Sequence, residues 1–158
     1  MTDGIDSIID QFEDLAENAD SIASKALYAA AGATADEVHK AISNIPTTKP
    51  KHGTPEDPVT GATAIEKKSL HDAVGIAPFR TEGGAVDTSV GFDGYSDVKT
   101  KRWPQGIPNA VIARSIESGT SWRKKSPFVR KTKQKAQKEI IKAAQEAAEE
   151  AINDIMKS

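Results

Sequence analysis

The apolar residues near the start of the chain recur at alternating steps of three and four positions. That spacing is typical of a helix with a narrow apolar seam, as in a coiled coil. The pattern predicts a long N-terminal helix, which either pairs with another helix or lies on a sheet of its own chain. Asp3 or Asp6 can cap its first turn. The seam consists of Ile5, Ile8, Phe12, Leu15, Ala19, Ile22 and Ala26.

The helical pattern extends beyond Gly32, through Val38 and Ile42 to Ile45. Pro46 has no backbone N–H to continue a helix, so we expect the helical region to end there. Residues 46–62 contain four of the chain's eight prolines and few apolar residues. This composition predicts an exposed loop or linker.

The middle of the chain has the period-two alternation of a half-buried strand. Apolar and polar residues alternate over residues 86–92, and residues 74–80 are rich in β-branched and aromatic side chains. Glu82-Gly83-Gly84 lies between them and is typical of a hairpin turn. We therefore expect an antiparallel hairpin, preceded by a short helix over residues 64–72. Because an isolated hairpin is only marginally stable, helices must cover its apolar face.

Two further helices are predicted in the C-terminal half of the chain. The first begins near Pro108, with Asn109 as its cap, and Gly119 is placed as its left-handed stop. The second starts at Ser126-Pro127, with serine as the cap and proline at the first position, and continues nearly to Ser158. Its apolar stripe is Phe128, Ala136, Ile140, Ala144, Ala147, Ala151 and Ile155.

Together these elements predict an α+β fold, with the long N-terminal and C-terminal helices packed on a small antiparallel β-sheet and with long irregular loops. We expect one domain over residues 1–158. Apolar residues make up 37% of the chain and aromatic residues 5%. The core must therefore be small, which favours dependence on partners or on oligomerisation. Along the chain the parts are the helical region 1–45, the Pro-rich loop 46–62, the sheet, short helices and basic loop of 63–125, and the C-terminal helix 126–158.

The net charge of −2 hides a strong separation of charge along the chain. Residues 1–46 contain nine acids and two lysines, a net charge of −7, whereas residues 99–138 contain twelve Lys or Arg and one Glu, a net charge of +11. Such segments indicate either that copies of the chain meet head to tail or that the basic segment faces an anion.

No catalytic pattern is present in the sequence. There is no cysteine, no Gly-rich phosphate loop and no zinc-protease motif. His39, His52 and His71 lie on different predicted elements, and His52 is expected to face solvent. We therefore expect no enzyme activity, no metal and no cofactor. The chain also has no long apolar run, so we expect no membrane span.

The chain contains, in this order, Val90-Gly91-Phe92, Glu117–Ser121 and Pro127–Arg130. These three motifs resemble those of the phage tail-completion family, whose members join heads to tails and resemble the gene-10 product of lambdoid coliphages. Val90-Gly91-Phe92 matches the end of a family strand. Glu117–Ser121 matches a helix end of the form Glu-x-Gly-Thr-Ser, and Pro127–Arg130 matches a Pro-Phe-hydrophobic-Arg step into the last helix. An opening family segment is matched only in part, by Gly61, Thr63, Lys68, Ser69 and Leu70.

The resemblance implies a structural protein of the virion that forms a ring, expected to be a hexamer, in the neck of a tailed phage. Such a ring joins head-closure (stopper) proteins to the tail terminator and tail tube, and it surrounds the DNA channel. The family has no associated catalytic site or cofactor. The expected location is the neck or tail of the virion, with the host cytoplasm as the place of assembly.

The residues expected to act lie on the N-terminal seam and in the basic loop. The expected subunit or ring interface comprises Ile8, Phe12, Leu15, Glu117, Gly119, Thr120, Ser121, Trp122, Pro127 and Phe128. The side chains expected to face a partner or DNA are Arg123, Lys124, Lys125, Arg130, Lys131 and Lys133.

The alternative function is sequence-nonspecific binding of nucleic acid through residues 99–138. Trp103 and Trp122 lie among basic residues in that segment, and aromatic rings between Lys and Arg can stack on bases. Phosphate neutralisation would then supply the affinity.

Overall fold

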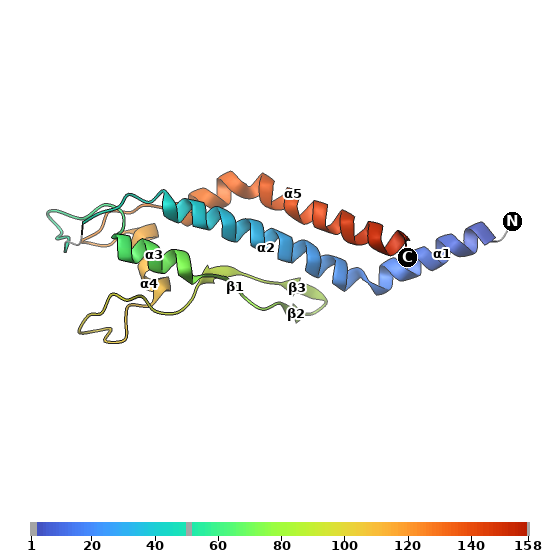
Figure 1. Ribbon diagram of the computed structural model, residues 1–158, viewed down its shortest axis with the longest axis horizontal. Helices are drawn as coiled ribbons and strands as arrows, with labels where there is room; N and C mark the ends of the chain where they lie inside the picture. Colours follow the sequence, from blue (N-terminus) through green and yellow to red (C-terminus); the bar gives the residue numbers. More distant parts are fainter. Residues whose placement is uncertain (1–2, 50–51, 158) are drawn as a thin grey trace. The chain divides into compact units, whose positions relative to one another are not determined.

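The computed structural model describes residues 3–49 and 52–157 and has an α+β fold (Figure 1). Over these ranges the helices are α1 (Asp3–Glu17), α2 (Ala19–Ser43), α3 (Ala64–Ala73), α4 (Asn109–Ser118) and α5 (Phe128–Lys157). The strands are β1 (Val74–Ile76), β2 (Arg80–Glu82), β3 (Ala85–Asp87) and β4 (Val90–Phe92). They form two antiparallel two-stranded sheets, β1 with β4 and β2 with β3.

The chain forms two compact units, and both α2 and α5 contribute residues to each of them. The core unit consists of Thr34–Ala77 and Val90–Gln137. The hairpin unit consists of the residues through Ala33, of Pro78–Ser89 and of the residues from Lys138 onward.

The core unit contains the main hydrophobic core of the described residues. Within it, α3 and α4 lie side by side, and β4 contacts both (Figure 1). Thr63 and Glu66 form a capping box at the start of α3, in which each side chain accepts a hydrogen bond from the other residue's backbone N–H. The buried cluster consists of Val38, Ile42, Ile45, Ala62, Leu70, Ile112, Ala113, Ile116 and Phe128.

The hairpin unit is organised differently, because its buried hydrophobic residues, among those described, are Ala31 and Ala151. Gly83 and Gly84 connect β2 to β3 with φ of +59° and +80°, which favours glycine at both turn positions. Tyr28 of α2 and Phe79, just before β2, have ring centroids 6.3 Å apart. The predicted hairpin turn is confirmed, but the unit has little buried apolar surface.

The predicted continuous strands are interrupted. Three residues, 77–79, separate β1 from β2, whereas two residues, 88–89, separate β3 from β4. Pro78 cannot donate a backbone hydrogen bond to a ladder, which accounts for a break at this place. The expectation of one sheet is therefore corrected to two short ladders.

The N-terminal helical region is also interrupted, at Asn18. α1 ends at Glu17 and α2 begins at Ala19, although the Ile22 amide still donates to the Asn18 carbonyl at 3.0 Å. The Asn18 side chain donates to the Asp14 carbonyl at 2.8 Å, a local bond that competes with the regular helix. α2 passes through Gly32 without a break and ends at Ser43, close to the expected stop at Pro46.

Asn109 is not the cap of α4, contrary to expectation. Pro108 occupies the N-cap position, and no side chain caps this end. Asn109 is buried instead; its amide nitrogen donates to the Asp93 carbonyl at 2.9 Å, and its oxygen accepts from the Ser69 hydroxyl at 2.8 Å. Its polar side chain thus connects α3, α4 and the end of β4.

Candidate interaction surfaces

The loop between α4 and α5, residues 119–127, is called here the basic loop. Gly119 ends α4 as expected, and its N–H donates to the Ser115 carbonyl at 3.0 Å. Its φ of +75° favours glycine, but its ψ of 171° lies outside the left-handed helical region that was expected. A Cβ at this position would lie 2.8 Å from the backbone nitrogen of Lys125. The loop therefore returns closely over the end of the helix.

Arg123 points into the core unit and does not face a partner. It is 4% exposed, its Nη2 lies 2.6 Å from Glu66 Oε1, and its Nη1 donates to the Gly61 carbonyl at 3.0 Å. Both partners precede it by more than fifty residues, which is why the local sequence did not reveal them. The expectation that Arg123 faces a partner or DNA is wrong, because its charge compensates the buried Glu66 carboxylate.

Glu117 and Phe128, two expected interface residues, have roles within the chain. The Glu117 carboxylate accepts from the amides of Val129 and Arg130 at 2.9 and 3.2 Å, so it caps the first turn of α5. Ser126 was expected to be this cap. Phe128 is 6% exposed and packs in the core, with its ring centroid 6.0 Å from that of Phe92. Phe128 is therefore mainly a core residue of its own chain, and only a small part of its side chain reaches the surface.

The other basic side chains of this region are exposed, as a partner-facing role requires. Arg130 lies 3.8 Å from the half-buried Glu117, and because the Arg130 side chain is exposed this pair contributes little to stability. Thr120, Ser121 and Trp122 are also exposed, and the Trp122 ring contacts the Arg123 guanidinium. What these residues bind stays a prediction. The exposed basic residues of the predicted set are Lys124, Lys125, Arg130, Lys131 and Lys133.

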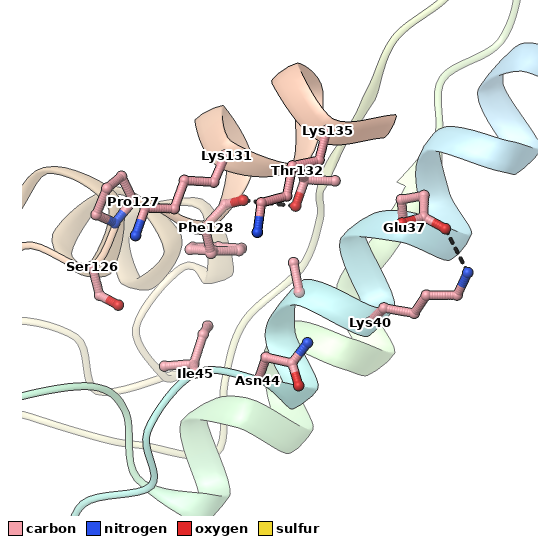
Figure 2. A pocket seen from close by; sticks show the side chains of 11 residues that line it. Glu37, Lys40, Asn44, Ile45, Ser126, Pro127, Phe128, Lys131, Thr132 and Lys135 are labelled. Carbon is pink, nitrogen blue, oxygen red and sulfur yellow. Dashed lines mark hydrogen bonds and ion pairs between the residues drawn. The ribbon is translucent and has the colours of Figure 1, made fainter. Parts of the chain in front are cut away.

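A cleft of about 280 Å³ lies within the core unit, between the end of α2 and the start of α5 (Figure 2). Lys131 and Lys135 extend from α5 toward its opening, and Asn44 faces them from α2. Lys40 at its edge pairs with Glu37. We call this the α2–α5 cleft. Its apolar lining comes from Ala41, Ile45, Pro127 and Phe128.

The α1 helix has an exposed apolar face, called here the α1 face. Ile5, Ile8, Ile9 and Phe12 are 63%, 52%, 48% and 68% exposed. They stand at positions i, i+3, i+4 and i+7, so they form one stripe. Leu15, the next seam residue, is half-buried. The predicted seam found this face but missed Ile9, which lies beside the alternating three-and-four steps.

His39 and His71 lie together, although they come from different helices. Their rings stack with centroids 4.3 Å apart, and His39 Nε2 is 3.0 Å from the His71 carbonyl oxygen. No local signal links two histidines 32 positions apart. Over residues 3–49 and 52–157, no group of three or more His, Asp or Glu residues could hold a metal ion. His52 is exposed, as expected.

An ion pair on the surface of α3 shifts the pKa values of both of its members. Lys68 Nζ lies 2.6 Å from Asp72 Oδ2. This hydrogen bond, together with the opposite charges, raises the pKa of Lys68 and lowers the pKa of Asp72. Both side chains are exposed, so solvent screens the pair, and it indicates no reactive site.

No family model, curated protein or solved structure matches this chain. The resemblance to tail-completion proteins therefore rests on the sequence motifs alone. Across the part of the chain that the structure describes, no helix is long and apolar enough to cross a bilayer.

Proposed function

We propose that this chain is a structural virion protein of a tailed phage, which forms an oligomeric ring in the neck and joins head-closure proteins to the tail. The observation that carries the proposal is the imbalance of the hairpin unit. Its buried hydrophobic residues, among those described, are two alanines, while nine large apolar side chains are exposed. These are Ile5, Ile8, Ile9, Phe12, Tyr28, Phe79, Ile141, Ile152 and Met156.

Such exposure favours association, because large apolar side chains that gather on one surface mark sites where another protein binds. The charges favour contact between unlike surfaces. α1 contains six acids and no Lys or Arg, whereas the first eleven residues of α5 contain five Lys or Arg and no acid. When two different surfaces of identical subunits meet, the contact is heterologous and can close into a ring.

The two best-matched motifs are coupled in the structure. Glu117 of the first motif caps the helix that begins at Phe128 of the second. Gly119 allows the intervening loop to return over the end of α4, next to Lys125. This coupling gives a structural reason for the two motifs to occur in this order and at this spacing. It supports a role for them in folding the connection between α4 and α5 rather than in catalysis.

In this proposal the neighbours are the head-closure (stopper) protein, the tail terminator and the tail tube, with channel DNA as a sequence-independent contact. The protein is not an enzyme and needs no cofactor. It acts in the neck or tail of the virion and assembles in the host cytoplasm.

Native mass spectrometry of the purified chain, with negative-stain imaging, tests the proposal. We expect a discrete oligomer, a hexamer, that images as a ring at low salt. High salt should weaken it, since exposed charges are screened beyond about 10 Å at 0.1 M ionic strength. A chain that stays monomeric at every protein and salt concentration contradicts the proposal.

The exposure of the basic residues on the basic loop and α5 favours one second function, sequence-independent binding of nucleic acid. The acids of α1 oppose it by repelling phosphate. A mobility-shift series across salt concentrations distinguishes this function. The alternative expects retardation at low salt that falls steeply as salt rises, and no retardation at low salt excludes it.

A further inference from the structure

The α1 face has the pattern of an amphipathic helix that binds in a groove. Helices of this kind present apolar anchors at positions i, i+3, i+4 and i+7. Ile5, Ile8, Ile9 and Phe12 occupy these positions, and Phe12 is 68% exposed. A side chain of that size and exposure is the natural anchor for a pocket on a partner.

Four of the six acids of α1 lie to one side of this face, and Asp14 lies opposite it. At 100° per residue, Asp6, Asp10, Glu13 and Glu17 fall on one flank of the apolar stripe. Ser7 and Gln11 fall on the opposite flank, which carries no charge. The helix therefore has an apolar centre, an acidic flank and a neutral flank, and its binding site should be arranged in the same order.

The α2–α5 cleft has that arrangement. Its apolar lining is formed by Ala41, Ile45, Pro127 and Phe128. Lys131 and Lys135 stand one helical turn apart on the α5 side, and no carboxylate among the described residues pairs with either of them (Figure 2). The α2 side presents the neutral amide of Asn44 and, at the edge of the cleft, Glu37 and Lys40, whose opposite charges pair with each other. A volume of about 280 Å³ lies just below the range of small-molecule sites, so the cleft suits a few side chains better than a cofactor.

We propose that α1 of one copy binds in the α2–α5 cleft of a second copy, with its apolar face on the lining, its acidic flank against Lys131 and Lys135, and its neutral flank against α2. The occupant is a second copy because α1 carries four exposed large apolar residues, six acids and no base. The acidic end of α5 suits the basic cleft less well than α1 does, because it also contains Lys142 and Lys157. This contact rests on the proposed ring, for which it supplies the heterologous interface.

The test uses two variants of the full chain, each with one of the two surfaces disabled. The first carries Ile8→Ser with Phe12→Ser, which disables the α1 face. The second carries Lys131→Glu with Lys135→Glu, which disables the basic side of the cleft. All four positions are exposed, so the core is not altered. Sedimentation velocity measures the assembly state of each variant alone and of their mixture.

We expect self-association of each variant to be at least about tenfold weaker than that of the natural chain. The mixture should give a one-to-one heterodimer and nothing larger, because a single intact helix then meets a single intact cleft. The charge-matched control, Lys138→Glu with Lys142→Glu, changes two exposed lysines one turn apart on α5 and should assemble like the natural chain. Neither control residue lines the cleft.

Four results overturn the proposal. A mixture that stays monomeric shows that α1 does not bind the cleft of another copy. A control that weakens assembly as much as the cleft variant shows that bulk charge alone drives association. A ring that survives both variants removes the docking contact but leaves the proposed function standing, whereas a natural chain that never forms an oligomer removes both.

Discussion

Arg123 is the residue whose role changes most between sequence and structure. It lies in the most basic stretch of the chain, yet its guanidinium is 4% exposed and binds the Glu66 carboxylate and the Gly61 carbonyl. A buried ion pair of this kind adds little compared with apolar packing, but the loss of one partner leaves an uncompensated charge in the core.

Arg123→Gln should therefore lower the free energy of unfolding by about 3–5 kcal/mol, because Glu66 remains buried without its charged partner. Urea denaturation measures the change. Lys124→Gln, at the exposed neighbouring position, should stay within about 0.5 kcal/mol of the natural chain. If the two variants lose the same stability, the buried pair does not stabilise the core unit. Adding Glu66→Gln to Arg123→Gln should cost less than the sum of the single changes.

Two glycines should respond in opposite directions to the same substitution. Gly119→Ala places a Cβ 2.8 Å from the Lys125 nitrogen at a φ of +75°, so we expect a loss of more than about 1 kcal/mol. Gly32→Ala adds a methyl group inside α2 with nothing within 4 Å, so we expect a gain of about 0.5–1 kcal/mol. Thermal and urea unfolding of both variants measure these changes. A Gly119→Ala variant as stable as the natural chain would show that the loop does not require glycine at this position.

At the scale of the element, α5 depends on a residue outside it. Its first turn has basic residues and no acid, the reverse of what the helix dipole favours. Glu117 supplies the missing negative charge at this helix end, since its carboxylate accepts hydrogen bonds from two backbone N–H groups of that turn. α4, the turn of the basic loop and α5 are thus joined by one side chain.

Glu117→Ala should cost about 1 kcal/mol, the usual range for losing a helix cap being about 0.5–2 kcal/mol. Glu139→Ala is the matched control, because Glu139 is exposed on α5, the helix that Glu117 caps, and no capping bond is described for it. Its effect should stay within about 0.5 kcal/mol. Urea midpoints compare the two, and similar midpoints would contradict a capping role.

The strands show why the local pattern was only partly sufficient at this scale. Alternation over residues 86–92 and the two glycines of the turn predicted a hairpin, and β2 and β3 confirm it. The pattern did not reveal the break at Pro78, because alternation reports which faces residues share and not whether hydrogen bonds continue. The tertiary structure separates the strands into two ladders.

At the scale of the whole molecule, buried apolar surface is concentrated in the core unit. Leu70, Ile42 and Ile116 are its fully buried large side chains, whereas the buried hydrophobic residues described for the hairpin unit are alanines. Local unfolding costs least where few apolar contacts must be broken. The hairpin unit should therefore open more readily than the core unit.

Hydrogen exchange should show this difference directly. We expect amides of α1 and of the α5 segment beyond Lys138 to exchange faster than those of α4 in the isolated chain, since little apolar surface holds them. In the assembled state α1 should become protected, because its apolar face would then be covered. Mass spectrometry at low and high protein concentration measures both states. Exchange of α1 that does not change on assembly would contradict a role for this face in the contact.

The sequence by itself determined the features that depend on near neighbours. It predicted the helices at both ends of the chain, the short helix that became α3, the extent of α4 and the turn at Gly83-Gly84. Each of these follows from periodicity or from residues a few positions apart. The apolar seam of α1 and the separation of charge were likewise visible without a structure.

Only the tertiary structure decided which charged and polar residues are internal. Arg123 pairs with Glu66 across 57 positions, and Asn109 pairs with Ser69 across 40. No local pattern specifies such partners, because they are fixed by how helices and loops pack into one core. The physical reason is that a buried polar group must find a partner wherever the fold places one.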